Sequence, residues 1–254
     1  MNKTILFAIA VFATLALVGC RDERPPNEVN SIEDVPGRFI GAFAGTPSAR
    51  LADELGTARV FFSGDELMYA LSSGTVDCVI MESVNAEELV SEIPEVRILG
   101  DTLIEYELRF AVPRENAQLL EVVNSALSEL EADGTLRNLR DKYFSGKSYV
   151  YVNTKEVEPR PGELTLAVAP DSPPYSYKDD EGNYTGLDVE VTRAVCDRLG
   201  VQLVISEVDA EELVTAVWFA RAHLAAGWLP GDINDQVSVS EPYADTAHVV
   251  IVRK

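Results

Sequence analysis

The chain has 254 residues, of which 46% are hydrophobic and 25% charged, and 42 acidic against 21 basic residues give a formal net charge of −21. These fractions are typical of a globular protein, and the length allows one large domain or two smaller lobes. So negative a chain repels phosphate backbones, which argues against nucleic-acid binding. Three cysteines without paired spacing and two histidines argue against a disulfide framework and a metal site, and no cofactor is expected.

Residues 1–19 have the pattern of a signal peptide. Lys3 precedes an apolar run, Ile5–Val18, that is shorter than the roughly 20 residues of a membrane-spanning helix. The run ends in Leu17-Val18-Gly19-Cys20, which resembles the bacterial lipobox, so we expect cleavage before Cys20 and lipidation of that residue. A plain signal peptide with an incidental cysteine is the alternative. The polar residues 20–31 are interpreted as a tether to a membrane surface.

Residues 32–112 alternate short strands with helices. Strands are predicted at Arg38–Phe43, Arg59–Phe62, Asp77–Met81, Val96–Leu99 and Leu108–Val112. Helices are predicted from Thr46-Pro47 to Leu55, at Asp65–Leu71 and at Ala86–Val90. This alternation predicts parallel strand pairing with helices on both faces of the sheet.

Residues 113–145 are predicted to form two helices, Glu115–Ala132 and Thr135–Tyr143, each with an apolar stripe at helical spacing. Residues 146–161 are interpreted as a linker, with an edge strand at Tyr149–Val152.

Residues 162–254 repeat the alternation. Strands are predicted at Leu164–Ala169, Gln202–Ser206, His223–Ala226 and His248–Val252. Two helices are predicted, Asp188–Leu199 with Asp188 as its N-cap, and Glu211–Ala220.

The segment 162–254 resembles the start of the bacterial extracellular solute-binding proteins of family 3, the receptors of ABC importers for polar amino acids. The matching residues are Leu164–Val168, Pro173-Pro174-Tyr175, Gly186–Glu190, Leu199-Gly200-Val201, Ala226-Gly227 and Ser240–Tyr243. Residues 37–143 resemble the rest of that family, through Gly41–Thr46, Gly74–Ile80, Tyr106–Arg114, Ala132–Thr135 and Lys142–Phe144.

The resemblance implies a two-lobed α/β clamshell of the periplasmic-binding-protein type (type II), each lobe being a mainly parallel sheet flanked by helices. Residues 32–112 would be lobe-2-like, whereas residues 113–145 and 162–254 would be lobe-1-like. The family has these segments in the opposite order, so we interpret the chain as circularly permuted. A truncated tandem duplication is the alternative. We expect one covalent crossover, near Val112–Arg114, and a meeting of the two ends in place of the other.

Such a fold binds its ligand between the lobes, at the carboxyl ends of strands. Gly45-Thr46 ends a strand and starts a helix, whose free N–H groups favour binding of a carboxylate. The alternative is an ordinary capped turn without a ligand. By resemblance, Glu82 takes the place of an Asp that binds a ligand ammonium, and Tyr175 that of an aromatic over the ligand. A surface glutamate and a packed ring are the alternatives. Gly227 belongs to the Ala-Gly loop, Trp228 follows it and would partly fill the crevice, and Phe43 adds an apolar wall.

The family places an Arg a few residues after that loop, to pair with an α-carboxylate. Here residues 228–236 contain no Arg or Lys, so we expect a crevice without arginine. One acid and up to three aromatic rings suit a cationic or amine ligand.

We therefore expect an extracytoplasmic, lipid-anchored, monomeric receptor that closes on a small polar solute, with an ABC permease as partner. No catalytic or metal-binding residue is expected. Two alternatives stay open. One is a sensory or partner-binding lipoprotein with a degenerate site, and the other an enzyme resembling cyclohexadienyl dehydratases, with Glu82 or Asp171 as general acid.

Overall fold

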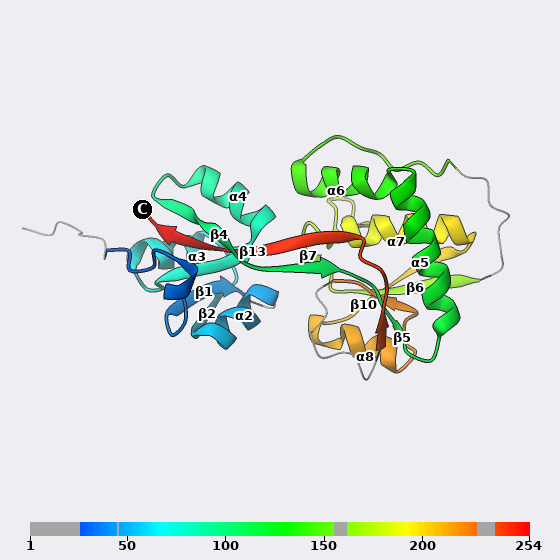
Figure 1. Cartoon of the computed structure of the whole chain (residues 1–254), viewed down its shortest axis with the longest axis horizontal. Helices are drawn as coiled ribbons and strands as arrows, with labels where there is room; N and C mark the ends of the chain where they lie inside the picture. The colour runs from blue at the N-terminus through cyan, green and yellow to red at the C-terminus, as the bar shows by residue number, and fades with distance from the viewer. Residues whose placement is uncertain (1–25, 45, 155–161, 228–236) are drawn as a thin grey trace, which may run out of the picture.

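A computed structural model describes residues 26–44, 46–154, 162–227 and 237–254, which form two α/β lobes joined by two long strands (Figure 1). Each lobe is built on a five-stranded sheet flanked by helices. In each sheet four strands run in one direction and the fifth runs against them. The predicted fold class is therefore confirmed. None of the described helices is both long and apolar enough to cross a membrane.

The first lobe begins with the single turn η1 (Ile32–Asp34). Its further elements are β1 (Phe39–Phe43), α2 (Pro47–Leu55), β2 (Thr57–Phe61), α3 (Gly64–Ser73), β3 (Cys78–Glu82), α4 (Ser83–Glu92) and β4 (Val96–Leu108). The sheet has the strand order β2-β1-β3-β13-β4, so the last strand of the chain, β13 (Ala244–Arg253), lies inside it.

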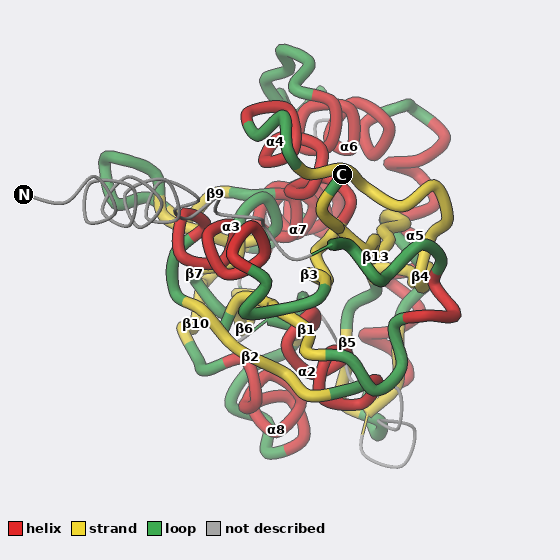
Figure 2. The backbone as a smooth tube through the Cα atoms, turned by 90° about the vertical axis from the view of Figure 1, so that its left-hand side faces the viewer, coloured by secondary structure: helices red, strands yellow, loops and turns green. Residues whose placement is uncertain are grey.

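Helices cover both faces of this sheet, which explains why β3 is apolar at successive positions. Ile80 packs in one cluster with Ala52 of α2, whereas Val79 packs on the other face with Leu67 of α3. Figure 2 shows α2 and α3 on opposite sides of β1 and β2. A Cβ atom on Gly41 of β1 would lie 2.8 Å from Cδ1 of Leu67, so α3 can approach the sheet only because this residue is glycine.

The second lobe contains β5 (Ala111–Pro113), α5 (Ala117–Ala132), α6 (Thr135–Ser145), β6 (Glu163–Val168), β7 (Asp171–Ser172), β8 (Ser176–Lys178), β9 (Tyr184–Thr185), α7 (Leu187–Leu199), β10 (Gln202–Glu207), η2 (Ala210–Glu212), α8 (Leu213–Trp218), β11 (Leu224–Ala225) and β12 (Val237–Val239). Its sheet has the order β10-β6-β11-β5-β12. In each sheet one strand arrives from the other lobe, β13 in the first and β5 in the second. When the other four strands of each sheet are numbered along the chain, both sheets have the same order: second, first, third, the arriving strand, fourth.

The two lobes are joined by the antiparallel strands β4 and β13, which pair from Ala244 opposite Leu108 to Arg253 opposite Val96. Because β4 continues into β5 and β13 follows β12, both crossings are covalent. The expectation of a single covalent crossover near residues 112–114 was therefore wrong. The two strands predicted at 96–99 and 108–112 are also replaced, by one long strand β4 and a separate short β5.

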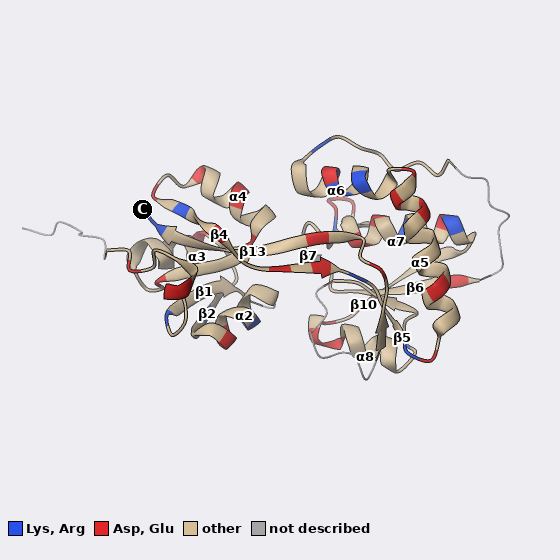
Figure 3. Cartoon of the chain, in the orientation of Figure 1, with Lys and Arg blue, Asp and Glu red and all other residues tan. Residues whose placement is uncertain are grey.

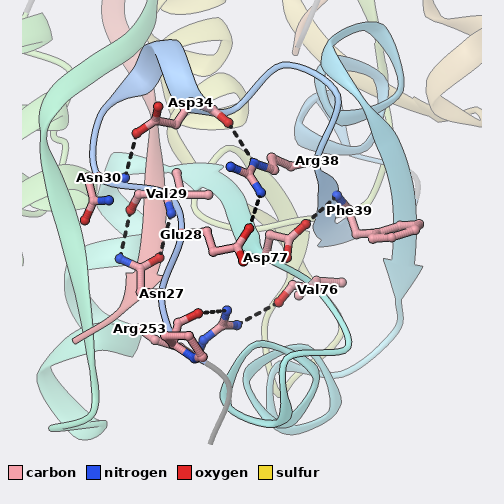
Figure 4. A network of polar contacts seen from close by, with 11 residues as sticks. Asn27, Glu28, Val29, Asn30, Asp34, Arg38, Phe39, Val76, Asp77 and Arg253 are labelled. Carbon is pink, nitrogen blue, oxygen red and sulfur yellow. Dashed lines mark hydrogen bonds and ion pairs between the residues drawn. The ribbon is translucent and has the colours of Figure 1, made fainter.

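Residues 26–29 lie beside the end of β13 in the first lobe (Figure 4). The Arg253 guanidinium donates from Nη1 to the carbonyl oxygens of Leu71 at 2.7 Å and Val76 at 2.8 Å, and from Nη2 to that of Pro26 at 3.4 Å. Val29 is fully buried in the same lobe. The two ends of the described chain thus meet beyond the crossing strands and not between the lobes.

Further hydrogen bonds tie residues 26–38 down (Figure 4). Arg38 pairs with Glu28 at 2.6 Å and donates from Nε to the Asp34 carbonyl oxygen at 3.2 Å. The Asp77 carboxylate accepts from the backbone N–H of Phe39 at 2.9 Å, which fixes the start of β1. The segment before β1 is therefore an ordered part of the first lobe.

Two local predictions in the second lobe were wrong. Described residues 146–154 contain no strand, because Tyr149 and Tyr151 pack their rings onto the core of the lobe instead of pairing with a sheet edge. Asp188 is not the N-cap of α7; Gly186 is, with φ +113°, and the Asp188 side chain is buried.

Candidate functional site

The two lobes enclose a cleft of about 570 Å³. The first lobe lines it with the carboxyl ends of β1, β2 and β3 and the first turn of α2. The second lobe contributes the loop after β6, the residues around η2 and the loop after β11, and the crossing strand β4 adds Tyr106 and Leu108. Ligands of open α/β sheets bind at such carboxyl ends, so this cleft is the candidate site. Acidic side chains are spread over both lobes and both crossing strands (Figure 3).

Five of the residues predicted to bind ligand line this cleft: Phe43, Thr46, Glu82, Tyr175 and Gly227. Gly45, Trp228 and Cys20 lie outside the described residues.

The start of α2 brings positive charge to the cleft. Thr46 is its N-cap residue, but its hydroxyl donates to the Phe43 carbonyl oxygen at 2.7 Å and makes no cap to the helix. An uncapped helix start carries a partial positive charge that favours an anionic group. Arg50, one turn further along, also lines the cleft. The expectation of a crevice without arginine was therefore wrong, because it considered only the loop after Gly227 in the opposite lobe.

Glu82 ends β3 and is the main acidic group of the first-lobe wall. Its Oε1 accepts a hydrogen bond from the Tyr106 hydroxyl at 2.8 Å. Burial raises the pKa of Glu82 to about 7; the hydroxyls of Tyr106 and Tyr175 act to lower it, and the charge of Asp188 adds to the increase. This carboxyl group therefore changes its charge near neutral pH, where a cationic ligand would stabilise the ionised form.

Four polar side chains meet where the lobes join, and we call Glu82, Tyr106, Tyr175 and Thr246 the hinge cluster. Tyr106 and Thr246 face each other as register partners on β4 and β13. The hydroxyl oxygens of Tyr175 and Thr246 are 2.9 Å apart, in addition to the bond between Tyr106 and Glu82. The cluster thus connects the first lobe, both crossing strands and the second lobe.

The loop before β8 holds Tyr175 against the cleft. The tyrosine is 6% exposed, and its ring meets Phe144 of α6 edge-on with 6.0 Å between centroids. A Cβ atom on Gly186 would lie only 2.2 Å from the carbonyl oxygen of Tyr175. Glycine is required at this position both for this contact and for its positive φ.

Behind the second-lobe wall lies a buried carboxyl group, Asp188. Its Oδ1 accepts from the Tyr243 hydroxyl at 2.7 Å, and its Oδ2 has no partner among the described residues. Burial raises the pKa of Asp188 to about 6. Gly227, which lines the cleft, lies next to this carboxyl group: a Cβ atom on Gly227 would be 4.0 Å from that Oδ2.

His248 of β13 completes the surroundings of the hinge cluster. Its ring stacks on Tyr106 with 5.3 Å between centroids, and neither ring nitrogen has a partner in the described part of the chain. Burial lowers its pKa to about 4, so the ring is neutral at physiological pH. It packs against Tyr106 and adds no charge to the cleft.

Sequence comparison finds a family match in the last third of the chain. The two α/β lobes with a cleft between them have the architecture that was predicted. Residues 164–254 match the model of the bacterial extracellular solute-binding proteins, family 3.

Curated relatives carry amino-acid-binding names. The histidine-binding periplasmic protein of Escherichia coli (strain K12) is 27% identical over 132 residues, which cover 47% of this chain and 51% of the relative. The L-cystine-binding protein TcyJ of the same strain is 26% identical over 120 residues, covering 46% and 45%. The chain thus spans about half the length of the curated relatives it matches. Among solved structures, a phosphate-binding protein of a phosphate ABC transporter from Streptococcus pneumoniae TIGR4 aligns over 86% of this chain and 89% of its own, with 10% identity and a TM-score of 0.48.

Proposed function

We propose that the protein is an extracytoplasmic solute-binding protein whose lobes close on a small cationic solute, an amine or an amino acid, for an ABC-type importer. The observation that carries the proposal is Glu82, a carboxyl group with a pKa near 7 in an interlobe cleft among the rings of Phe43, Tyr106 and Tyr175. A carboxylate and ring faces bind ammonium groups. Arg50 and the start of α2 would hold a carboxylate where the solute is an amino acid.

Isothermal titration calorimetry tests this proposal. The panel contains L-arginine, L-histidine, putrescine, choline and neutral amino acids, titrated into wild type, Glu82→Gln and the control Glu88→Gln on the exposed side of α4. We expect a cationic solute to bind wild type and the control alike and to bind Glu82→Gln at least tenfold more weakly. Tight binding of a neutral amino acid, unchanged by Glu82→Gln, would overturn the cationic class. No binding by any solute would favour the sensory alternative.

We also propose that the chain is a circularly permuted, lipid-anchored member of this receptor class, with a signal peptide at 1–19 and a linker at 146–161. The predicted tether, 20–31, would be shorter, because residues 26–31 belong to the first lobe. The predicted lobe segment 162–254 would be shorter too, because its last strand, β13, lies in the first-lobe sheet. The contact between Arg253 and Pro26 supports the permutation, since a short link there would restore the family order. A rejoined chain, residues 162–254 followed by 27–154, should fold with the same melting temperature to within a few degrees. Palmitate labelling that is lost in Cys20→Ser would support the anchor.

A second candidate is an enzyme resembling cyclohexadienyl dehydratases. It is favoured by the same Glu82, because a carboxyl group with a pKa of about 7 is partly protonated at neutral pH and can act as a general acid. The relatives described above are binding proteins by name, which favours the receptor. Turnover of prephenate by wild type and not by Glu82→Gln would support the enzyme.

A further inference from the structure

Tyr106 occupies a fixed position between the lobes. It lies on β4, opposite Thr246 of β13, so its backbone belongs to the pair of strands that joins the lobes. One face of its ring stacks on His248, and its hydroxyl donates to Glu82 at 2.8 Å. Burial raises the pKa of Tyr106 far above the physiological range, so the hydroxyl keeps its proton and can only donate to a carboxylate.

The groups around Glu82 give its negative charge little other support. Asp188 of α7 opposes ionisation, and His248 of β13 is neutral. Tyr175, from the second-lobe loop, contributes a neutral hydroxyl. Glu211 of η2 and Arg50 of α2 also line the cleft, with opposite charges. No ion pair to Glu82 is present in the described part of the chain, so hydrogen bonds from hydroxyl groups are what stabilise the carboxylate before a solute binds.

We propose that Tyr106 is a positioning residue for solute binding, whose hydroxyl, anchored on a strand shared by both lobes, holds the Glu82 carboxylate ionised and aimed into the cleft and so sets the pH range in which a cation is bound. This inference rests on the proposed function, because it assumes that Glu82 receives the cationic group. It goes further in assigning a role to a side chain that need not touch the solute.

Binding of the cation is then coupled to release of a proton from Glu82. A cation beside Glu82 favours the ionised form, so below the midpoint of its titration each binding event releases up to one proton to solvent. The affinity for a permanently charged solute therefore falls as the pH drops below about 7, the pKa of Glu82. Without the Tyr106 hydroxyl the carboxyl group protonates more readily, and this loss of affinity begins at a higher pH.

The test uses Tyr106→Phe, which keeps the ring that stacks on His248 and removes only the hydroxyl. The matched control is Tyr69→Phe on α3, where the side chain is 74% exposed. Carbon-13 NMR of labelled glutamate follows the titration of Glu82 without any ligand, with the signal assigned through Glu82→Gln. Calorimetry then measures the affinities of L-arginine and choline, which stay cationic throughout, between pH 5 and pH 8.5.

In Tyr106→Phe we expect the Glu82 midpoint to rise by about one pH unit and the affinity at pH 7 to fall about fivefold, with no change in Tyr69→Phe. The double variant Tyr106→Phe/Glu82→Gln should bind as Glu82→Gln does, because the tyrosine acts through the carboxylate. An unshifted midpoint would overturn the positioning role even if both probes bind. A shifted midpoint without binding of either probe would overturn the link to cation capture, and with it the proposed solute class.

Discussion

Glu82 should make the stability of the ligand-free protein depend on pH in a direction that Glu82→Gln abolishes. The pKa of this carboxyl group is about 7 in the folded protein, against 4.5 for an ordinary glutamate. Between these values the folded state binds the proton that the unfolded state has lost. The stabilisation is fully present below about pH 4.5 and is lost as the pH rises through 7. A difference of 2.5 pH units corresponds to about 3 kcal/mol.

Urea unfolding of wild type and Glu82→Gln at pH 4.5, 6, 7 and 8 measures this effect. The pH dependence from Asp188, whose pKa burial raises to about 6, is present in both proteins, so most of it cancels in the difference between their unfolding free energies and only its interaction with Glu82 remains. We expect that difference to shift by about 3 kcal/mol in favour of the glutamine variant between pH 4.5 and pH 8. Since glutamine is uncharged, it is the more stable form in alkaline solution.

The same experiment can refute the reasoning. If the difference between the two proteins is equal at pH 4.5 and pH 8, Glu82 has an ordinary pKa and is not desolvated in the cleft. If the difference moves in the opposite direction, the carboxylate is stabilised by a positive charge that outweighs burial, and the cleft would not need a cationic solute.

Three further substitutions test the framework around the site. Arg253→Met leaves the backbone carbonyls of Leu71 and Val76 without their charged donor and should lower the unfolding free energy by about 3 kcal/mol, whereas an unchanged value would mean that these carbonyls do not depend on Arg253. Gly186→Ala should cost more than about 3 kcal/mol, because the new Cβ would overlap a backbone carbonyl, while the control Gly182→Ala has φ +83° with open space and should cost about 1 kcal/mol; equal melting temperatures would contradict this contact. Tyr243→Phe removes the hydrogen bond that Asp188 accepts and should cost about 2 kcal/mol at pH 8, and a neutral effect there would show that Asp188 is solvated.

The fold could be predicted from the sequence where the pattern of apolar residues within a segment shows how that segment is buried. β3 was recognisable because its successive apolar residues suit a strand buried on both faces, and β4 was not. Most residues between 100 and 107 in β4 are exposed, as expected of a strand that crosses between lobes. Its partner β13 is distant in the sequence, so nothing local reveals the continuous ladder or the two covalent crossings.

The same distinction applies to the site. Phe43 and Glu82 end apolar strands, and strand ends converge on the cleft, so both could be placed there. Arg50 was missed because it resembles an ordinary exposed residue of α2, and only the approach of the lobes brings that turn to the cleft. Tyr106 was missed as a contact of Glu82 because its neighbours are supplied by strand pairing.

Native mass spectrometry tests most directly whether the interlobe cleft holds a small cationic solute through Glu82. Wild type and Glu82→Gln would be equilibrated with the fraction of a cell extract below 1 kDa and then transferred intact to the spectrometer. We expect one bound small molecule with a cationic group on wild type, which is absent from the variant. Equal occupancy of both proteins by the same molecule, or no bound molecule on wild type, would contradict the account.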